Sequence, residues 1–297
     1  MKICISGGAG FIGSHLVERC VKDGHEVWVI DDYSTGRVEN IINVYGKIKV
    51  ISKDISQIDF FDDYDVIFHV AAKASIPDSI KDPLFFHNQN VGGIMKVLEL
   101  ARRTGAILIF SSSSSVYGDT ETIPTLEESK LNPMSPYALN KLIGEQYMRL
   151  YSMLYGVKSV ALRYFNVFGE RQETANGGYC LVLSKFLEQY KNKEPFTIVG
   201  TGEQKRDFVY VEDVVEANMK AVEFADKMGT FEIFNIGGGK NYSINELADM
   251  IDKNHPRVNL PPRIEPREML ADITKARAFL GWSPKIKLEE WLKQVSS

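Results

Sequence analysis

The feature that most constrains the fold is an alternation of short, continuously apolar runs with helix-like stretches in the first half of the chain. The apolar runs are rich in Ile and Val, and we expect them to be strands: Lys2–Ser6, Glu26–Ile30, Lys47–Ser52, Val66–Val70, Ala106–Phe110 and Ser159–Leu162. Helical periodicity marks Phe11–Val21, Asn90–Arg103 and Tyr137–Tyr155 between them. Strands that are apolar on both faces have to be covered on both faces, so the alternation predicts an α/β fold with a doubly wound parallel sheet.

The regular alternation ends near Asn166, where Gly- and Pro-rich segments begin to interrupt the chain. Helices are expected near Leu181–Tyr190 and Ile244–Ile251, and no internal repeat is present. We therefore predict a first domain over 1–166 and a smaller C-terminal domain over 167–207 and 237–297. The segment 208–236 is expected to return to the first domain, with Phe208–Val211 and Phe231–Ile236 rejoining the sheet.

Composition excludes several classes of function. The chain has 297 residues and a net charge of −4, with no cluster of basic residues, so a nucleic-acid partner is not expected. The apolar run Ala106–Phe110 is far shorter than the roughly 20 residues that a membrane helix needs, so no membrane association is expected either.

The N-terminus and the cysteines indicate a soluble protein of the cytoplasm. The chain enters a strand-like run at Lys2, which leaves no room for a signal peptide. Cys4, Cys20 and Cys180 are odd in number and lack a CxxC spacing, which is typical of buried thiols in a reducing compartment. The histidines are scattered, without an HExxH pattern, so no metal site is predicted.

The first chemical signal is Gly7-Gly8-Ala9-Gly10-Phe11-Ile12-Gly13, between the first strand and the first helix. Glycines at this spacing allow a tight turn and a close backbone approach to a pyrophosphate, which then lies at the positive end of the helix. Because Ser14 and His15 stand where a P-loop needs Lys, the segment predicts a dinucleotide-binding Rossmann sheet instead.

The second signal is Asp31-Asp32, at the end of the second strand. A carboxylate there accepts hydrogen bonds from the adenosine ribose and repels a 2′-phosphate, which favours NAD over NADP. Asp31 is the better candidate because it comes first after the strand. Arg37 is the one nearby residue that could neutralise this charge.

The third signal is Tyr137 and Lys141, four residues apart on a helix that Ser135-Pro136 is expected to begin. Tyr has a reference pKa near 10, and a nearby ammonium favours its phenolate. The pair therefore predicts a tyrosine that acts as a base.

Together these residues resemble the extended short-chain dehydrogenase/reductases, in particular the NAD-dependent epimerase/dehydratase group. Further matching segments extend the resemblance over nearly the whole chain: His69–Ala72, Asn90-Val91, Phe110–Gly118, Leu162–Asn166, Arg206–Asp213, Phe234–Gly237 and Leu280–Pro284.

The resemblance implies roles for individual residues. Tyr137 would be the catalytic base, Lys141 its modulator, and Ser113 the hydrogen-bond partner of the reacting sugar hydroxyl. The cofactor NAD would contact Gly7, Gly10, Phe11, Ile12, Gly13, Asp31, Asp32, Asp54, Ile55, Ala71, Ala72, Lys73, Asn90, Ser111, Tyr137, Lys141 and Tyr164. The substrate would contact Ser113, Tyr137, Asn166, Arg206, Met269 and either Arg263 or Arg267, with the diphosphate bound by Asn166 and the arginines.

The resemblance also separates possible reactions. Dehydratases and decarboxylases of the group carry an acid directly after the Ser or Thr, whereas this chain has Ser114 and Ser115. The sequence therefore favours an NAD-dependent nucleotide-sugar 4-epimerase that interconverts UDP-glucose and UDP-galactose. The alternatives are UDP-N-acetylglucosamine or UDP-glucuronate 4-epimerase, a dehydratase, a decarboxylase, and a regulator that binds the dinucleotide without catalysis.

Two expectations concern substrate size and assembly. Met269 falls where the group gates the 2-substituent of the sugar, and a flexible Met is expected to favour UDP-glucose and UDP-galactose while admitting some N-acetylated sugar. The group commonly dimerises through the helices Asn90–Arg103 and Tyr137–Tyr155, so a homodimer is expected. Most apolar residues of these helices, among them Leu142, Ile143, Met148, Leu150 and Met153, are predicted to belong to the core.

Overall fold

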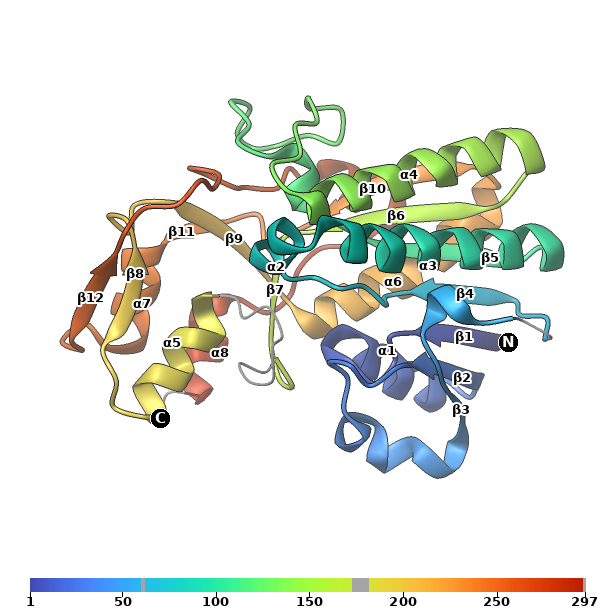
Figure 1. Cartoon of the computed structure of the whole chain (residues 1–297), viewed down its shortest axis with the longest axis horizontal. Coiled ribbons are helices and arrows are strands. Elements are labelled where there is room, and N and C mark those ends of the chain that lie inside the picture. Colours follow the sequence, from blue (N-terminus) through green and yellow to red (C-terminus); the bar gives the residue numbers. More distant parts are fainter. Residues whose placement is uncertain (60–61, 173–181, 296–297) are drawn as a thin grey trace.

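The computed structural model describes residues 1–59, 62–172 and 182–295. Its centre is a seven-stranded, wholly parallel sheet in the order β10-β6-β5-β4-β1-β2-β3 (Figure 1). The strands are β1 (Lys2–Ser6), β2 (Glu26–Asp31), β3 (Ile48–Ser52), β4 (Val66–His69), β5 (Ile107–Ser113), β6 (Ser159–Tyr164) and β10 (Phe231–Ile236). The predicted α/β class and doubly wound sheet are confirmed.

Helices cover both faces of this sheet. One face is covered by α3 (Pro83–Thr104) and α4 (Pro136–Tyr155), and the other by α1 (Phe11–Lys22) and α6 (Val211–Met228). The short elements between them are η1 (Val38–Lys47), η2 (Ile55–Gln57), α2 (Ile76–Lys81), η3 (Ser114–Tyr117) and η4 (Ala276–Leu280). Buried Val and Ile side chains of alternate strand positions form one core on each face, as expected for strands that are apolar on both sides.

The remaining elements lie on one side of the main sheet (Figure 1). A three-stranded sheet has the order β11-β9-β7, and a pair of strands consists of β12 and β8. These elements are β7 (Asn166–Phe168), α5 (Val182–Lys191), β8 (Phe196–Val199), β9 (Lys205–Tyr210), β11 (Asn241–Ser243), α7 (Ile244–Asp252), β12 (Arg257–Leu260) and α8 (Leu288–Val295). They share a third core of aromatic and aliphatic side chains.

One prediction about the returning segment is wrong. Phe231–Ile236 joins the main sheet beside β6, but Phe208–Val211 does not. Lys205–Tyr210 instead pairs with β7 and β11 in the three-stranded sheet. The short apolar run around Phe208 is buried in either position, so its composition did not distinguish the two sheets. The division into two domains at the stated residues stays a prediction.

The serine run differs from its expected form. We expected the strand to end at Phe110, but β5 continues through Ser113, and Ser111, Ser112 and Ser114 are buried. The helix predicted at Asn90 begins earlier, at Pro83, where Asp82 caps it. The predicted cap at Ser135 is confirmed, because its side chain accepts a hydrogen bond from the amide of Ala138.

The apolar residues of α4 are not mostly core. Met148 is fully buried, but Leu150 and Met153 are 43% and 75% exposed. The helix therefore buries one face and leaves an apolar stripe on the other. Cys4 and Cys20 are buried as expected, whereas Cys180 lies outside the described residues. Of the helices within the described ranges, none has the length and apolar character needed to span a membrane.

Candidate active site

A cavity of about 490 Å³ lies at the carboxyl edge of the main sheet. It is lined from the ends of β1, β2 and β4, together with the first turn of α1 and the helix α3. The strand order reverses between β1 and β4, which is where ligands of doubly wound sheets bind.

The glycine segment closes the floor of this cavity by direct backbone contact. Gly7 has a φ of +74°, and a side chain there would lie 2.7 Å from the amide nitrogen of Ala71. A Cβ on Gly13 would lie 2.0 Å from the carbonyl oxygen of Gly7. Both positions therefore require glycine, and the first turn of α1 lies at the wall of the cavity, where a helix N-terminus can bind an anion.

Most of the predicted cofactor residues meet in this one cavity. Of the predicted cofactor residues, those that line it are Gly7, Gly10, Phe11, Ile12, Gly13, Asp31, Asp32, Asp54, Ile55, Ala71, Ala72, Lys73 and Asn90. Ser111, Tyr137, Lys141 and Tyr164 are not among its lining residues. They lie at the neighbouring strands β5 and β6 and on α4.

The two aspartates after β2 have different surroundings. Asp31 is buried, and its carboxylate accepts hydrogen bonds from the amides of Ala9 at 2.8 Å and Tyr33 at 2.9 Å. Burial raises the pKa of Asp31, and these two amides oppose the shift. Asp32 instead accepts a hydrogen bond from the Ser34 hydroxyl at 2.6 Å and forms an ion pair with Lys73 at 2.9 Å. Against the effect of burial, these two contacts hold the pKa of Asp32 below its usual value. Asp31 is therefore the carboxylate that the fold itself fixes toward the glycine segment.

Tyr137 and Lys141 lie on the same face of α4, as their spacing predicts. The ammonium of Lys141 is 5.8 Å from the centre of the Tyr137 ring and donates a hydrogen bond of 2.6 Å to the carbonyl of Ser111. Burial lowers the pKa of Lys141 to about 7, while the carboxylate of Glu145 acts in the opposite direction. A small change in the local field therefore changes the charge of this lysine near neutral pH.

Two further predicted residues lie around this pair. Ser113 ends β5, and its hydroxyl accepts a hydrogen bond from the amide of Ser115 at 3.2 Å. Tyr164 is buried at the end of β6, with its hydroxyl within 3.2 Å of the Ser111 hydroxyl and 3.0 Å of the Asn218 amide oxygen.

The predicted diphosphate ligands come from the three-stranded sheet and the 263–269 segment. The Asn166 amide donates to the carbonyl of Asp207 at 2.7 Å, next to Arg206 on β9. The Glu265 carboxylate forms ion pairs with two of the arginines, Arg206 at 2.6 Å and Arg263 at 3.5 Å. The structure thus brings Arg263 to the same carboxylate as Arg206.

The other two candidates of this segment are placed differently. The Arg267 side chain is 76% exposed and pairs with Asp119 at 2.9 Å. Met269 donates its amide to the carbonyl of Lys205 at 3.0 Å, and its side chain packs, partly buried, against the core that contains α1 and α6.

Sequence reasoning missed Arg171, which also lines the cavity. It follows β7 with a φ of +67°, donates to the Ser14 hydroxyl at 3.1 Å, and pairs with Glu18 at 2.7 Å. These partners place its guanidinium beside the first turns of α1. No local pattern marks Arg171, because only the fold brings it back to a helix that begins at Phe11.

His69 is a buried histidine at the end of β4. Its Nδ1 lies 2.7 Å from the Ser6 hydroxyl, and burial lowers the pKa of His69 to about 3. Over residues 1–59, 62–172 and 182–295, no group of three or more His, Cys, Asp or Glu side chains is arranged to hold a metal ion.

Comparison with known proteins gives consistent results. The model of the NAD dependent epimerase/dehydratase family matches residues 3–237. A putative UDP-glucose 4-epimerase of Methanocaldococcus jannaschii is 38% identical over 306 residues, which cover 99% of this chain and 96% of that protein.

Two solved structures share the whole architecture. UDP-glucose 4-epimerase of Thermotoga maritima with UDP-glucose has a TM-score of 0.91 at 36% identity, covering 100% of this chain and 97% of that one. UDP-N-acetylglucosamine 4-epimerase of Methanobrevibacter ruminantium M1, in complex with UDP-N-acetylmuramic acid, has a TM-score of 0.92 at 35% identity, with coverage of 99% and 96%.

Proposed function

Since the chain belongs to the NAD dependent epimerase/dehydratase family, with NAD as its cofactor, we propose that it is a UDP-sugar 4-epimerase that interconverts UDP-glucose and UDP-galactose. The proposal depends on the family, on the serine, tyrosine and lysine around β5 and α4, and on the residues that follow Ser113.

The residues around the cavity fit NAD. The glycine segment and the first turn of α1 line the cavity, where a helix N-terminus can bind a pyrophosphate, and Asp31 is fixed beside them for the adenosine ribose. When bound, NAD would supply the hydride acceptor and donor for C4 of the sugar. The remaining chemistry belongs to side chains of this chain.

We assign the proton transfer to Tyr137. Its phenolate takes the proton of the 4-hydroxyl and later returns it, while the ammonium of Lys141 favours the ionised form. Ser113 holds the same hydroxyl by a hydrogen bond. Asn166, Arg206 and Arg263 are proposed to bind the diphosphate, and Arg suits that geometry.

The single observation that favours epimerisation is the chemistry directly after Ser113. Ser114 and Ser115 have no acid or base function near neutral pH. Glu145, the acid bonded to the neighbouring Ser112, is fully buried and held by Arg163 at 2.7 Å. A dehydratase has to remove a second proton and expel a hydroxyl, whereas a 4-epimerase needs only the base that it has already used.

The test is incubation with NAD and a panel of UDP-sugars, followed by chromatographic separation of the C4 epimers. We expect UDP-glucose and UDP-galactose to interconvert to an equilibrium mixture. Turnover confined to UDP-N-acetylglucosamine or UDP-glucuronate would move the assignment to those substrates. A 4-keto-6-deoxy product or released carbon dioxide would establish a dehydratase or decarboxylase, and bound NAD without any turnover would indicate a regulator.

Sugar size is tested at Met269. An unbranched Met moves aside at modest cost, so we expect measurable activity on the N-acetylated pair as well. Met269→Tyr should suppress the N-acetyl reaction selectively, and Met269→Ser should raise it. Parallel changes on both substrate pairs would mean that Met269 only packs against the core.

We also propose a homodimer formed through α3 and α4. The supporting observation is the apolar stripe that α4 leaves exposed, which includes Leu139, Leu150, Met153 and Leu154. Burial of such a stripe against its copy follows the symmetric pattern of most soluble oligomers.

A further inference from the structure

A fully buried ion pair joins α4, the helix that carries Tyr137 and Lys141, to strand β6. Glu145, one turn beyond Lys141 on α4, is 0% exposed, and Arg163 on β6 is 1% exposed. Two nitrogens of Arg163 donate to the two carboxylate oxygens of Glu145, at 2.9 and 2.7 Å. A buried pair of this kind is weak evidence for stability, because desolvation offsets its attraction. Its position next to the proposed base suggests another role.

The Glu145 carboxylate also reaches the strand that ends at Ser113. It accepts a hydrogen bond of 2.6 Å from the Ser112 hydroxyl. One residue earlier on the same strand, the carbonyl of Ser111 accepts the hydrogen bond from Lys141. Two turns of α4 are thus tied to two successive residues of β5, which fixes Tyr137 and Lys141 relative to Ser113.

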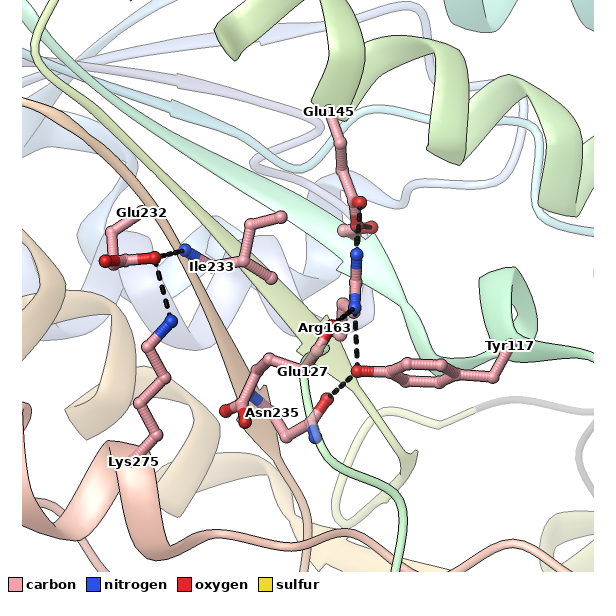
Figure 2. A network of polar contacts seen from close by, with 9 residues as sticks. Tyr117, Glu127, Glu145, Arg163, Glu232, Ile233, Asn235 and Lys275 are labelled. Carbon is pink, nitrogen blue, oxygen red and sulfur yellow. Dashed lines mark hydrogen bonds and ion pairs between the residues drawn. The ribbon is translucent and has the colours of Figure 1, made fainter. Parts of the chain in front are cut away.

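The other side of the pair is fixed equally well. Arg163 donates through its third nitrogen to the Tyr117 hydroxyl at 2.8 Å and to the Glu127 carbonyl at 2.9 Å. The Tyr117 hydroxyl then donates to Asn235 on β10 at 2.6 Å. Figure 2 shows Arg163 between Glu145 and Tyr117, with Asn235 beyond them. The guanidinium therefore cannot turn without breaking contacts to several elements.

The groups around Lys141 show how the ion pair can influence the charge of this lysine. On α4, Lys141 faces Tyr137 and Glu145. On β5, it faces the carbonyl of Ser111 and lies 4.8 Å from the centre of the Phe110 ring; from β4 it faces His69, whose pKa it helps to lower. Glu145 is the carboxylate that raises the pKa of Lys141 against burial.

We propose that Glu145 and Arg163 are a positioning pair for the proposed Ser113, Tyr137 and Lys141 site: Glu145 holds Ser112 and faces Lys141, while Arg163 fixes the Glu145 carboxylate and offsets part of its charge. This inference rests on the proposed roles of the three site residues, but not on the identity of the sugar. Arg163 pairs with Glu145 and carries the opposite charge, so the two charges act on Lys141 in opposite directions.

The arrangement predicts an order among variants that a merely structural pair would not give. Glu145→Gln leaves the Arg163 charge unopposed and should lower the pKa of Lys141. Arg163→Met leaves Glu145 unopposed and should raise it. The double variant E145Q/R163M should fall between Glu145→Gln and the wild type, because both charges are gone.

The measurement is the pH titration of the Lys141 signal by NMR of protein with labelled lysines, assigned by its loss in Lys141→Met. The same series is assayed for turnover and for NAD affinity. We expect Glu145→Gln to lower kcat by about 10- to 100-fold through misplacement of the site, with KM changed far less. Its kcat should also begin to decline at a lower pH than in the wild type, because Lys141 loses its proton earlier.

Glu216→Gln is the matched control, because it removes the ion pair of Arg19 and Glu216 between α1 and α6 on the other face of the sheet. It should leave the Lys141 titration and kcat unchanged. If Arg163→Met does not fold, the double variant and Glu145→Gln still give the order.

Equal Lys141 titration midpoints in the wild type, Glu145→Gln and the double variant would overturn the proposal. So would a shift of the same size in the Glu216→Gln control. A wild type that binds NAD but turns over no UDP-sugar would instead refute the proposed function, while the order of titration midpoints would still test the pair.

Discussion

The proposed role of Tyr137 as a base depends on a single atom, its phenolic oxygen. Tyr137→Phe keeps the ring against Lys141 but removes the ionisable hydroxyl. We expect turnover to fall by about 10² to 10⁴, the usual effect of losing a positioned acid or base. NAD affinity, measured by calorimetry, should change little. Near-normal turnover would remove Tyr137 from the proposed role.

Arg171 gives a second residue-scale prediction, which concerns the cofactor alone. Its guanidinium lines the cavity beside the first turns of α1, held by Ser14 and Glu18. A contact with a charged partner contributes about 1.5 to 3 kcal/mol, so Arg171→Ala should weaken NAD binding by roughly 10- to 100-fold. Calorimetric titration with NAD measures this directly.

Glu18→Gln is the control for Arg171, because it removes the ion-pair partner but keeps the guanidinium. It should weaken NAD binding much less than Arg171→Ala. Equal effects of the two variants would mean that the ion pair merely stabilises α1.

At this scale the sequence predicts residues whose chemistry depends on local spacing. Gly7, Gly13, Tyr137 and Lys141 are of this kind, because a turn or a helix brings them together. Arg171 is not of this kind, because the sequence around an arginine does not reveal whether its side chain lies on the surface or contacts a distant helix. Only the fold distinguishes them.

Helix α4 has a buried polar face and an exposed apolar face. Lys141 and Glu145 point into the molecule, whereas Leu150 and Met153 are exposed. If the exposed stripe forms the proposed dimer interface, the double variant L150E/M153E should be monomeric, because two carboxylates would be buried against the copy. Size-exclusion chromatography with light scattering gives the mass.

Met228→Glu is the matched control for the α4 stripe. Met228 is also exposed, at 57%, but lies at the end of α6. Its variant should keep the mass of the wild type. A wild type that is already monomeric would contradict the proposed dimer.

The elements also show why the sequence predicts too early an end for strand β5. Serine has little preference for strands, so the sequence indicates an end at Phe110. The strand continues because Ser111, Ser112 and Ser113 pair with β6, while Lys141 and Glu145 bind the Ser111 carbonyl and the Ser112 hydroxyl. Partners that are distant along the chain thus decided the length of β5, as the partners of Lys205–Tyr210 decided which sheet it joins.

At the scale of the molecule, buried polar groups connect the main sheet to the segments that lead to the substrate residues. Asn235 on β10 receives a hydrogen bond from Tyr117 and donates to the carbonyls of Thr125 and Asp272. Thr125 in turn pairs with Ala271, shortly after Met269. The alternation of strands and helices predicts the sheet, but it carries no information about such cross-connections, since each one joins two irregular segments.

The whole molecule should also lose stability in mild acid through His69, which is buried in the core of the main sheet. Burial lowers its pKa to about 3 from an ordinary value near 6.5. The unfolded chain therefore binds a proton at His69 below pH 6.5, whereas the folded protein binds it only near pH 3. The free energy of unfolding consequently falls as the pH falls through this range. At pH 5 the free energy of unfolding is about 2 kcal/mol lower than at pH 7, which corresponds to about 4 °C in Tm.

Thermal unfolding of His69→Gln, followed by circular dichroism at pH 7 and pH 5, should show a smaller drop in Tm than the wild type. His87→Gln, at an exposed position on α3, should keep the full drop. Equal drops in the wild type and His69→Gln would show that other groups cause the acid sensitivity.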